Sequence, residues 1–213
     1  MIQARLDKVK TVLCLGAHSD DIEIGCGASV LRLIQEQPGL QFFWFVFSTS
    51  GARTREAKQS AREFLQGTRS PKIRIANFQD GYFPSHWPAI KDAFEEAKRQ
   101  FKPDLVLTHH REDRHQDHRV LSDLAWNTFR NHLVLEYEIP KYDGDLGRPN
   151  VFIPVSREIA ERKVAALIRH FKSQSERQWF TADTFWAMLR LRGIECASPS
   201  GFAEAFHGRK LQL

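Results

Sequence analysis

The feature that most constrains the fold is an alternation, along most of the chain, of short apolar segments and longer segments with helical periodicity. Several apolar segments are hydrophobic at every position, which is typical of strands covered by helices on both faces. This alternation predicts a parallel sheet joined by crossover helices. The predicted strands are residues 11–16, 42–48, 73–78, 104–109, 134–139 and 151–155, and the predicted helices are residues 27–37, 54–66, 87–101, 117–130, 157–172 and 182–192.

The length of 213 residues fits one domain with a single substantial core. No internal repeat, low-complexity tract or linker rich in Gly and Ser divides it. We therefore predict a single α/β domain over residues 1–213, with a Rossmann-like, mostly parallel sheet flanked by helices. Only the extreme polar tail, HGRKLQL, is expected to be loosely held.

Composition narrows the class of protein. Hydrophobic residues make up 42% and charged residues 27%, and no window approaches the roughly 18 apolar residues of a membrane span. The first residues lack the apolar core of a secretory signal, so we expect a cytoplasmic protein with no membrane partner. Three cysteines without CxxC spacing favour reduced thiols over disulfides or a thiolate metal site.

The net charge of +5 raises the question of a nucleic-acid partner. The densest basic stretch, residues 53–74, has the spacing of the solvated side of an amphipathic helix. No predicted strand surface interleaves aromatic with basic residues, as a single-strand binding surface would. We therefore expect no nucleic-acid partner.

Polar clusters follow four of the predicted strands, where a parallel sheet binds ligands. They are AHSDD after the first strand, STSGAR after the second, QDGY after the third and HHREDRHQDH after the fourth. Because these strand ends meet at one edge of the sheet, we expect one site there.

Two of these clusters carry metal-ligand chemistry. His18, Asp20 and Asp21 share one tight turn, and a turn of this kind joined by one distant ligand leaves positions open for water and substrate. His115 and His118 have i, i+3 spacing at the start of a helix, so both can face one ion or one substrate. A purely structural interpretation stays open, because Asp20, Asp21 and Asp117 also suit helix caps or first turns.

The two clusters resemble the signatures of a known family, the PIG-L/LmbE-like N-deacetylases. AHSDDIEIGCG is similar to the signature AHPDDxExGxG, and HQDH is similar to the signature HxDH about 100 residues later. The segment GFAEAF near residue 206 resembles the C-terminal part of the family. Ser19 stands where the family usually has Pro, a change expected to alter the stiffness of the turn more than its chemistry.

The resemblance implies specific roles. His18, Asp21 and His118 would bind a divalent ion, zinc or ferrous iron, and Asp20 would be the general base. His115 would be a charged group that stabilises the oxyanion and protonates the leaving amine. Asp117 is placed to hydrogen-bond an imidazole, and we expect that of His115.

The resemblance implies a small sugar substrate with an N-acetyl group, and fewer members act on other amides or on thiol conjugates. Candidates for substrate contact at the strand ends are Arg53, toward an anionic substituent such as phosphate, and Asp80 and Glu138, toward sugar hydroxyls. The other lining candidates are Tyr82, Arg114 and Tyr142.

Two further questions stay open. A metal-dependent phosphoesterase is an alternative reaction, although two-metal sites usually need more bridging carboxylates than the chain assigns. The apolar segment FFWFVF and the tryptophans leave room for a homo-oligomer interface.

Overall fold

The computed structural model describes residues 5–212, and the expected domain limits at residues 1 and 213 lie outside them. Within that range, seven strands form one sheet with the order β3-β2-β1-β4-β5-β7-β6. The strands are β1 (Thr11–Gly16), β2 (Gln41–Val46), β3 (Lys72–Ile75), β4 (Leu105–His109), β5 (Leu133–Tyr137), β6 (Val151–Val155) and β7 (Phe202–Gly208).

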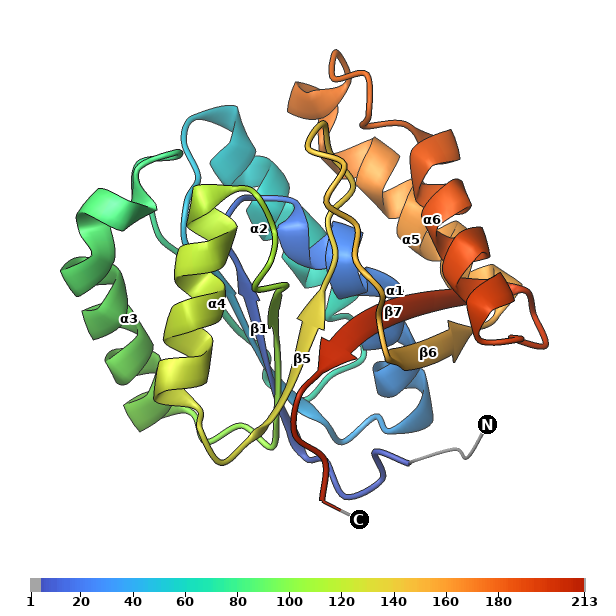
Figure 1. The fold of residues 1–213 in the computed structure, drawn as a ribbon, viewed down its shortest axis with the longest axis horizontal. Helices are drawn as coiled ribbons and strands as arrows, with labels where there is room; N and C mark the ends of the chain where they lie inside the picture. The colour runs from blue at the N-terminus through green and yellow to red at the C-terminus, as the bar shows by residue number, and fades with distance from the viewer. Residues whose placement is uncertain (1–4, 213) are drawn as a thin grey trace.

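The first five strands are parallel, and β7 pairs antiparallel with both β5 and β6. The predicted mostly parallel α/β sheet is therefore confirmed. The six predicted strands are all present, while β7 falls in a segment for which no strand was predicted. It lies between β5 and β6, as Figure 1 shows with the red arrow beside β5.

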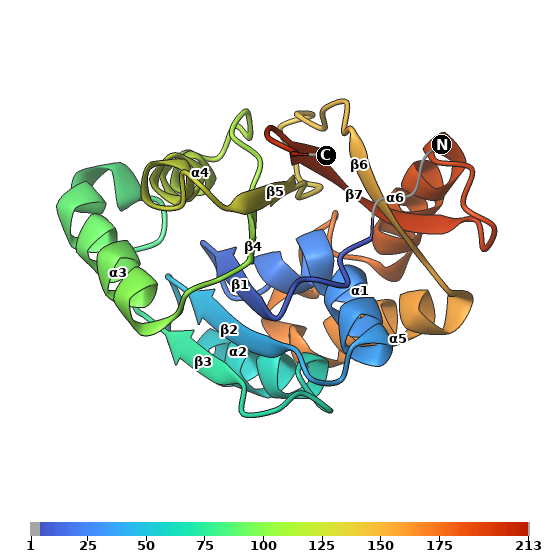
Figure 2. The ribbon, with the colours of Figure 1, turned by 90° about the horizontal axis from the view of Figure 1, so that it is seen from below.

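Helices cover both faces of the sheet. On one face α1, α2, α5 and α6 pack together, and α3 packs on α4 on the other. Figure 2 shows the two layers on opposite sides of the strands. The α-helices are α1 (Asp21–Glu36), α2 (Ala52–Phe64), α3 (Trp87–Gln100), α4 (Gln116–Thr128), α5 (Arg157–His170) and α6 (Ala182–Glu195).

The apolar segments form strands because they are buried on both faces. In β1 every residue after Thr11 is buried, and in β2 every residue after Gln41 is buried. Alternate side chains enter two separate apolar cores, one under each helical layer. The strands are apolar at nearly every position because each of their two faces packs into a separate core.

The start of α1 differs from the prediction. The helix begins at Asp21, six positions before the predicted start at residue 27. Gly25 and Gly27 therefore lie inside α1, where packed rings leave no room for a side chain. An added Cβ would come 2.1 Å from the ring of Tyr137 at Gly25 and 2.7 Å from the ring of Phe64 at Gly27. At Gly25, α1 therefore packs closely against Tyr137, the last residue of β5.

Within residues 5–212, no helix has both the length and the apolar character needed to cross a bilayer.

Candidate metal centre

The centre forms where β1 and β4 end side by side. β1 pairs directly with β4, so the turn after β1 and the loop after β4 lie next to each other. The first carries His18 and Asp21, and the second leads to His118 in the first turn of α4. All three side chains are buried. The sheet order therefore brings together residues that are 100 positions apart.

Three donor atoms converge at this place. His18 Nδ1 lies 3.2 Å from His118 Nε2 and 3.3 Å from Asp21 Oδ2, and His118 Nε2 lies 3.5 Å from the same Asp21 oxygen. A tetrahedral ion with bonds of about 2.1 Å separates its ligands by about 3.4 Å. The three atoms therefore have the mutual spacing of one face of such a coordination sphere, and two imidazoles with one carboxylate suit zinc or ferrous iron.

The electrostatics around these three side chains favour a positive charge, either a proton on His18 or a metal ion that replaces it. Burial by itself would lower the pKa of His18, but Asp21, Asp117 and Asp80 raise it well above its usual value. The pKa of Asp21 lies well below its usual range, because His118, His109 and His18 outweigh the effect of burial. Burial and His109 together lower the pKa of His118 to about 3, so its ring is neutral, as a metal ligand must be.

Carboxylates behind the two imidazoles orient them. His118 Nδ1 donates to Asp113 Oδ2 at 2.9 Å. His18 Nε2 lies 3.0 Å from Asp80 Oδ1 and 3.3 Å from Asp117 Oδ2. Histidine ligands commonly have such a partner on the ring nitrogen that faces away from the ion. These contacts leave His18 Nδ1 and His118 Nε2 to face the centre.

Asp117 differs from its predicted role. Its carboxylate lies against His18 and accepts the backbone N–H groups of Gly81 and Phe83 at 2.7 and 3.1 Å. The contact with His115 instead runs from the Asp117 backbone N–H to the ring Nδ1, at 3.2 Å. The expectation that the Asp117 side chain hydrogen-bonds His115 was wrong, because that carboxylate instead binds His18 and the backbone N–H groups that follow β3.

His115 stands over the other two rings. Its ring is 4.7 Å from that of His18, edge to face, and 4.6 Å from that of His118, nearly parallel. Burial and then the charge on His18 lower the pKa of His115, so its neutral form is favoured, where a charged group was expected. Its Nδ1 accepts a bond, so the proton sits on Nε2.

Asp20 is buried next to Asp21, but its carboxylate is not among the three converging donor atoms. Burial raises its pKa to about 6, against the lowering effect of Arg53. Arg53 Nη2 donates to Asp20 Oδ1 at 3.2 Å, and Arg53 Nε donates to the hydroxyl of Ser19 at 2.8 Å. A carboxylate with a pKa near neutrality is suited to exchange a proton at that pH.

Motif reasoning missed two buried residues, Asp113 and His109. His109 lies close enough to Asp21 and His118 to form a donor group with them. However, its Nε2 accepts the N–H of Ala17 at 2.9 Å, and its ring stacks on His118 at 3.9 Å. Rings stacked in parallel cannot both direct a lone pair at one ion, and His109 instead packs against the face of the His118 ring. The doublet His109-His110 at a strand end was the one available signal.

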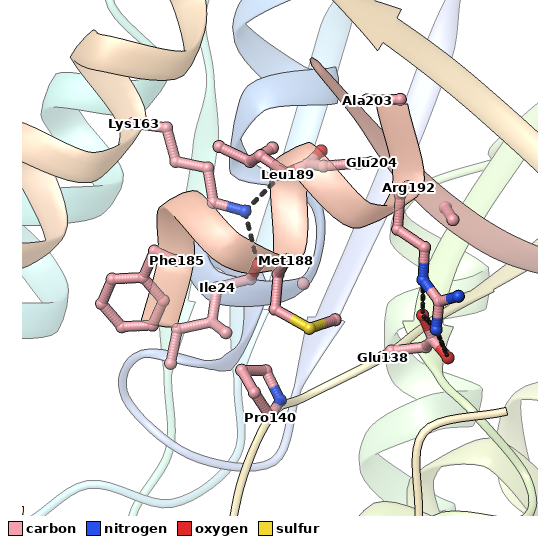
Figure 3. Close-up of a pocket in the computed structure, with 12 residues that line it drawn as sticks. Ile24, Glu138, Pro140, Lys163, Phe185, Met188, Leu189, Arg192, Ala203 and Glu204 are labelled. Atoms are coloured by element: carbon pink, nitrogen blue, oxygen red, sulfur yellow. Dashed lines mark hydrogen bonds and ion pairs between the residues drawn. The ribbon is translucent and has the colours of Figure 1, made fainter. Parts of the chain in front are cut away.

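Glu138 is not brought to the cluster. It is buried, and Arg192 of α6 donates to both its oxygens at 2.9 and 3.0 Å (Figure 3). It also accepts the N–H of Gly147 at 2.9 Å. Tyr82 and Tyr142 are exposed, and Asp80 is half exposed beside Arg53. Among the predicted substrate contacts, the structure thus places Arg53 at the centre and Glu138 away from it.

The sequence of this chain matches known proteins. The family model described as PIG-L: GlcNAc-PI de-N-acetylase matches residues 13–129. An Escherichia coli (strain K12) protein named uncharacterized deacetylase YaiS is 33% identical over 175 residues, covering 77% of this chain and 92% of that protein.

Two solved structures share the fold. N,N'-diacetylchitobiose deacetylase from Pyrococcus horikoshii is 21% identical, with a TM-score of 0.75 over 98% of this chain and 87% of that one. The 4-carboxy-2-hydroxymuconate hydratase GalB from Pseudomonas putida KT2440 is 16% identical, with a TM-score of 0.70 over 96% and 98% of the two chains. One fold therefore serves two reactions, and the family assignment comes from the sequence match. By that match, the chain belongs to the PIG-L family of deacetylases.

Proposed function

We propose that this protein is a metal-dependent N-deacetylase that removes the acetyl group from an N-acetyl-hexosamine-like sugar. The observation that carries the proposal is the convergence of one oxygen and two nitrogen atoms at 3.2 to 3.5 Å, with the buried carboxylate of Asp20 on the residue next to Asp21. Zinc is the first candidate ion and ferrous iron the second. A divalent ion there supplies Lewis acidity, which lowers the pKa of water and polarises an acyl oxygen.

The chain's own residues supply the proton transfers. Asp20 takes the proton of the attacking water, since its carboxylate is adjacent to the ligands and its pKa is raised to about 6. Arg53 holds one oxygen of Asp20, so that the other stays free for this task. General base catalysis of this kind contributes about 10² to 10⁴ in rate.

His115 acts on the developing oxyanion. Its neutral ring donates a hydrogen bond from Nε2–H to that oxygen, so the lowered pKa of His115 is compatible with this role. The proton for the leaving amine comes from Asp20, which took it from the attacking water. Arg53, with about a quarter of its side chain exposed, extends from Asp20 toward Asp80 at the rim, where both can contact the sugar.

The test measures bound metal and released acetate together. Purified protein is assayed for ion content and for acetate released from N-acetylglucosamine and diacetylchitobiose, with other amides, thiol conjugates and phosphate esters in parallel. Acetate release from the sugars is expected. Phosphate release without acetate would replace the proposal with a phosphoesterase, and cleavage of only the other amides would redirect it to another amidase substrate.

Two variants separate the roles. Asp20→Asn should bind the ion normally and lose at least about a hundredfold in turnover. His118→Ala should lose the ion itself. Asp123→Asn is the matched control, because Asp123 lies further along α4 and pairs with Arg111 at the surface. An Asp20→Asn enzyme as active as the control would refute the assigned base.

A further inference from the structure

Lys141, in the loop after β5, lies behind the loop that carries His115 and His118. Its ammonium group is 3.0 Å from Asp113 Oδ2 and 2.5 Å from Asp145 Oδ2. The Lys141 side chain is only 9% exposed, and those of Asp113 and Asp145 are 3% and 7% exposed. The lysine is therefore part of a buried charged cluster, although its sequence context shows no motif.

Both carboxylates in this cluster accept hydrogen bonds from residues 114–118, the segment that carries His115 and His118. Asp113 Oδ2, the oxygen that Lys141 contacts, accepts His118 Nδ1 at 2.9 Å. Asp113 Oδ1 accepts the backbone N–H of His115 at 2.8 Å. Asp145 Oδ2 accepts the backbone N–H of Arg114 at 2.7 Å. One ammonium group thus joins the two acceptors that set the position of three neighbouring residues.

The charge balance depends on this lysine. Among residues 5–212, it is the only Lys or Arg side chain within ion-pair distance of Asp113 or Asp145. Carboxylates this far from water are strongly destabilised without a cation nearby. Without Lys141, Asp113 and Asp145 would repel each other or turn toward solvent, and either movement would release His118.

The loop that delivers Lys141 is fixed at its base. Glu138 and Arg192 form a buried ion pair. Gly147 binds both partners: its N–H donates to Glu138, and its carbonyl oxygen accepts from Arg192 Nη2 at 3.4 Å. Both ends of the segment from Glu138 to Gly147 are therefore held at the Glu138–Arg192 ion pair, and this fixes the position of Lys141 against Asp113. Glu138 thus has a structural role at the base of this loop.

We propose that Lys141 is a positioning residue for the metal centre, which holds Asp113 and thereby keeps His118 Nε2 directed at the ion. The inference rests on the proposed function in one respect, that the donor atoms of His18, Asp21 and His118 bind a metal. It adds a determinant of ion affinity that lies outside both signature segments.

The experiment measures metal affinity directly. Metal-free protein is titrated with Co²⁺, whose visible spectrum reports ligand geometry, and affinity is obtained by competition with a chelator at one fixed pH. Lys141→Met should bind Co²⁺ about 10 to 100 times more weakly than the unchanged protein, the range found when partners of metal ligands are removed. Its cobalt spectrum should also change. Lys141→Arg, which keeps the charge, should recover most of the affinity.

The matched control is Lys91→Met, because Lys91 is also partly buried in an ion pair, with Glu95 of α3, away from the centre. This control should leave affinity and spectrum unchanged. Circular dichroism checks the fold, and Lys141→Gln, expected to lose affinity in the same way, takes the place of the methionine variant if that variant does not fold.

The outcomes separate the two proposals. If the unchanged protein binds one Co²⁺ and the folded Lys141 variants match the Lys91→Met control, the positioning role is overturned and the proposed function stands. If the unchanged protein binds no ion, the proposed function itself fails.

Discussion

Replacing Lys163 of α5 with methionine should destabilise the whole domain. Lys163 Nζ lies 2.5 Å from Glu204 Oε1 and donates to the carbonyl of Ile24 at 2.6 Å. Glu204 in turn accepts the N–H groups of Ala28 and Ser29 in α1. Lys163 and Glu204 are each 4% exposed. Figure 3 shows the lysine reaching between the helices toward these groups.

The magnitude follows from this burial. Breaking a buried ion pair by removing one partner costs about 3 to 5 kcal/mol, because the other charge stays without compensation. In a domain of this size, 1 kcal/mol corresponds to about 2 to 4 °C of melting temperature. The free energy of unfolding of Lys163→Met should thus fall by about 3 to 5 kcal/mol and its melting temperature by about 6 to 20 °C.

Urea denaturation followed by circular dichroism measures the change. The control is Arg157→Gln on the same helix, since Arg157 and Glu161 form an exposed pair, which contributes less than about 1 kcal/mol. A loss below about 1 kcal/mol in Lys163→Met would mean that water reaches the Lys163–Glu204 pair, and the reasoning from burial would be refuted.

Two other predictions test packing and pH. Gly25→Ala should lower the free energy of unfolding by about 1 to 3 kcal/mol, because its Cβ would meet the Tyr137 ring, whereas Gly39→Ala, with nothing within 4 Å, should be neutral in the same urea assay. Although burial raises the pKa of Glu136, imidazole, indole and backbone donors lower it below its usual value. Its stabilising effect is therefore complete above the unfolded pKa of about 4.3 and lost as pH falls through the folded pKa. Trp126, which donates to Glu136, should report this loss by fluorescence, and Glu136→Gln should remove the Glu136 contribution to it.

The sheet was predictable because its strands are marked by local sequence alone. An apolar segment buried on both faces has the same appearance wherever it lies in the sheet. β7 escaped prediction because Glu204 interrupts its apolar pattern, and that charge is buried only through Lys163 and the backbone of α1. A contact between distant elements has no local signal.

The same distinction divides the site. His18, Asp21 and His118 were predictable as a group because each follows a strand whose end lies at the same edge of the sheet. Asp113 and Lys141 were not, since their role depends on which atom of a neighbour they face. Glu138 was misplaced for that reason: its position at a strand end was right, but its side chain turns to Arg192.

The contact between Glu204 and α1 has a consequence for how the protein is made. The helix that carries Asp21 donates the N–H groups of Ala28 and Ser29 to the carboxylate of Glu204, which lies 176 positions beyond Ala28. Translation must therefore proceed through β7 before α1 can form all of these contacts. A nascent chain that stops short of this strand contains both signature segments but lacks the acceptor for α1, so the centre matures only after β7 has been synthesised.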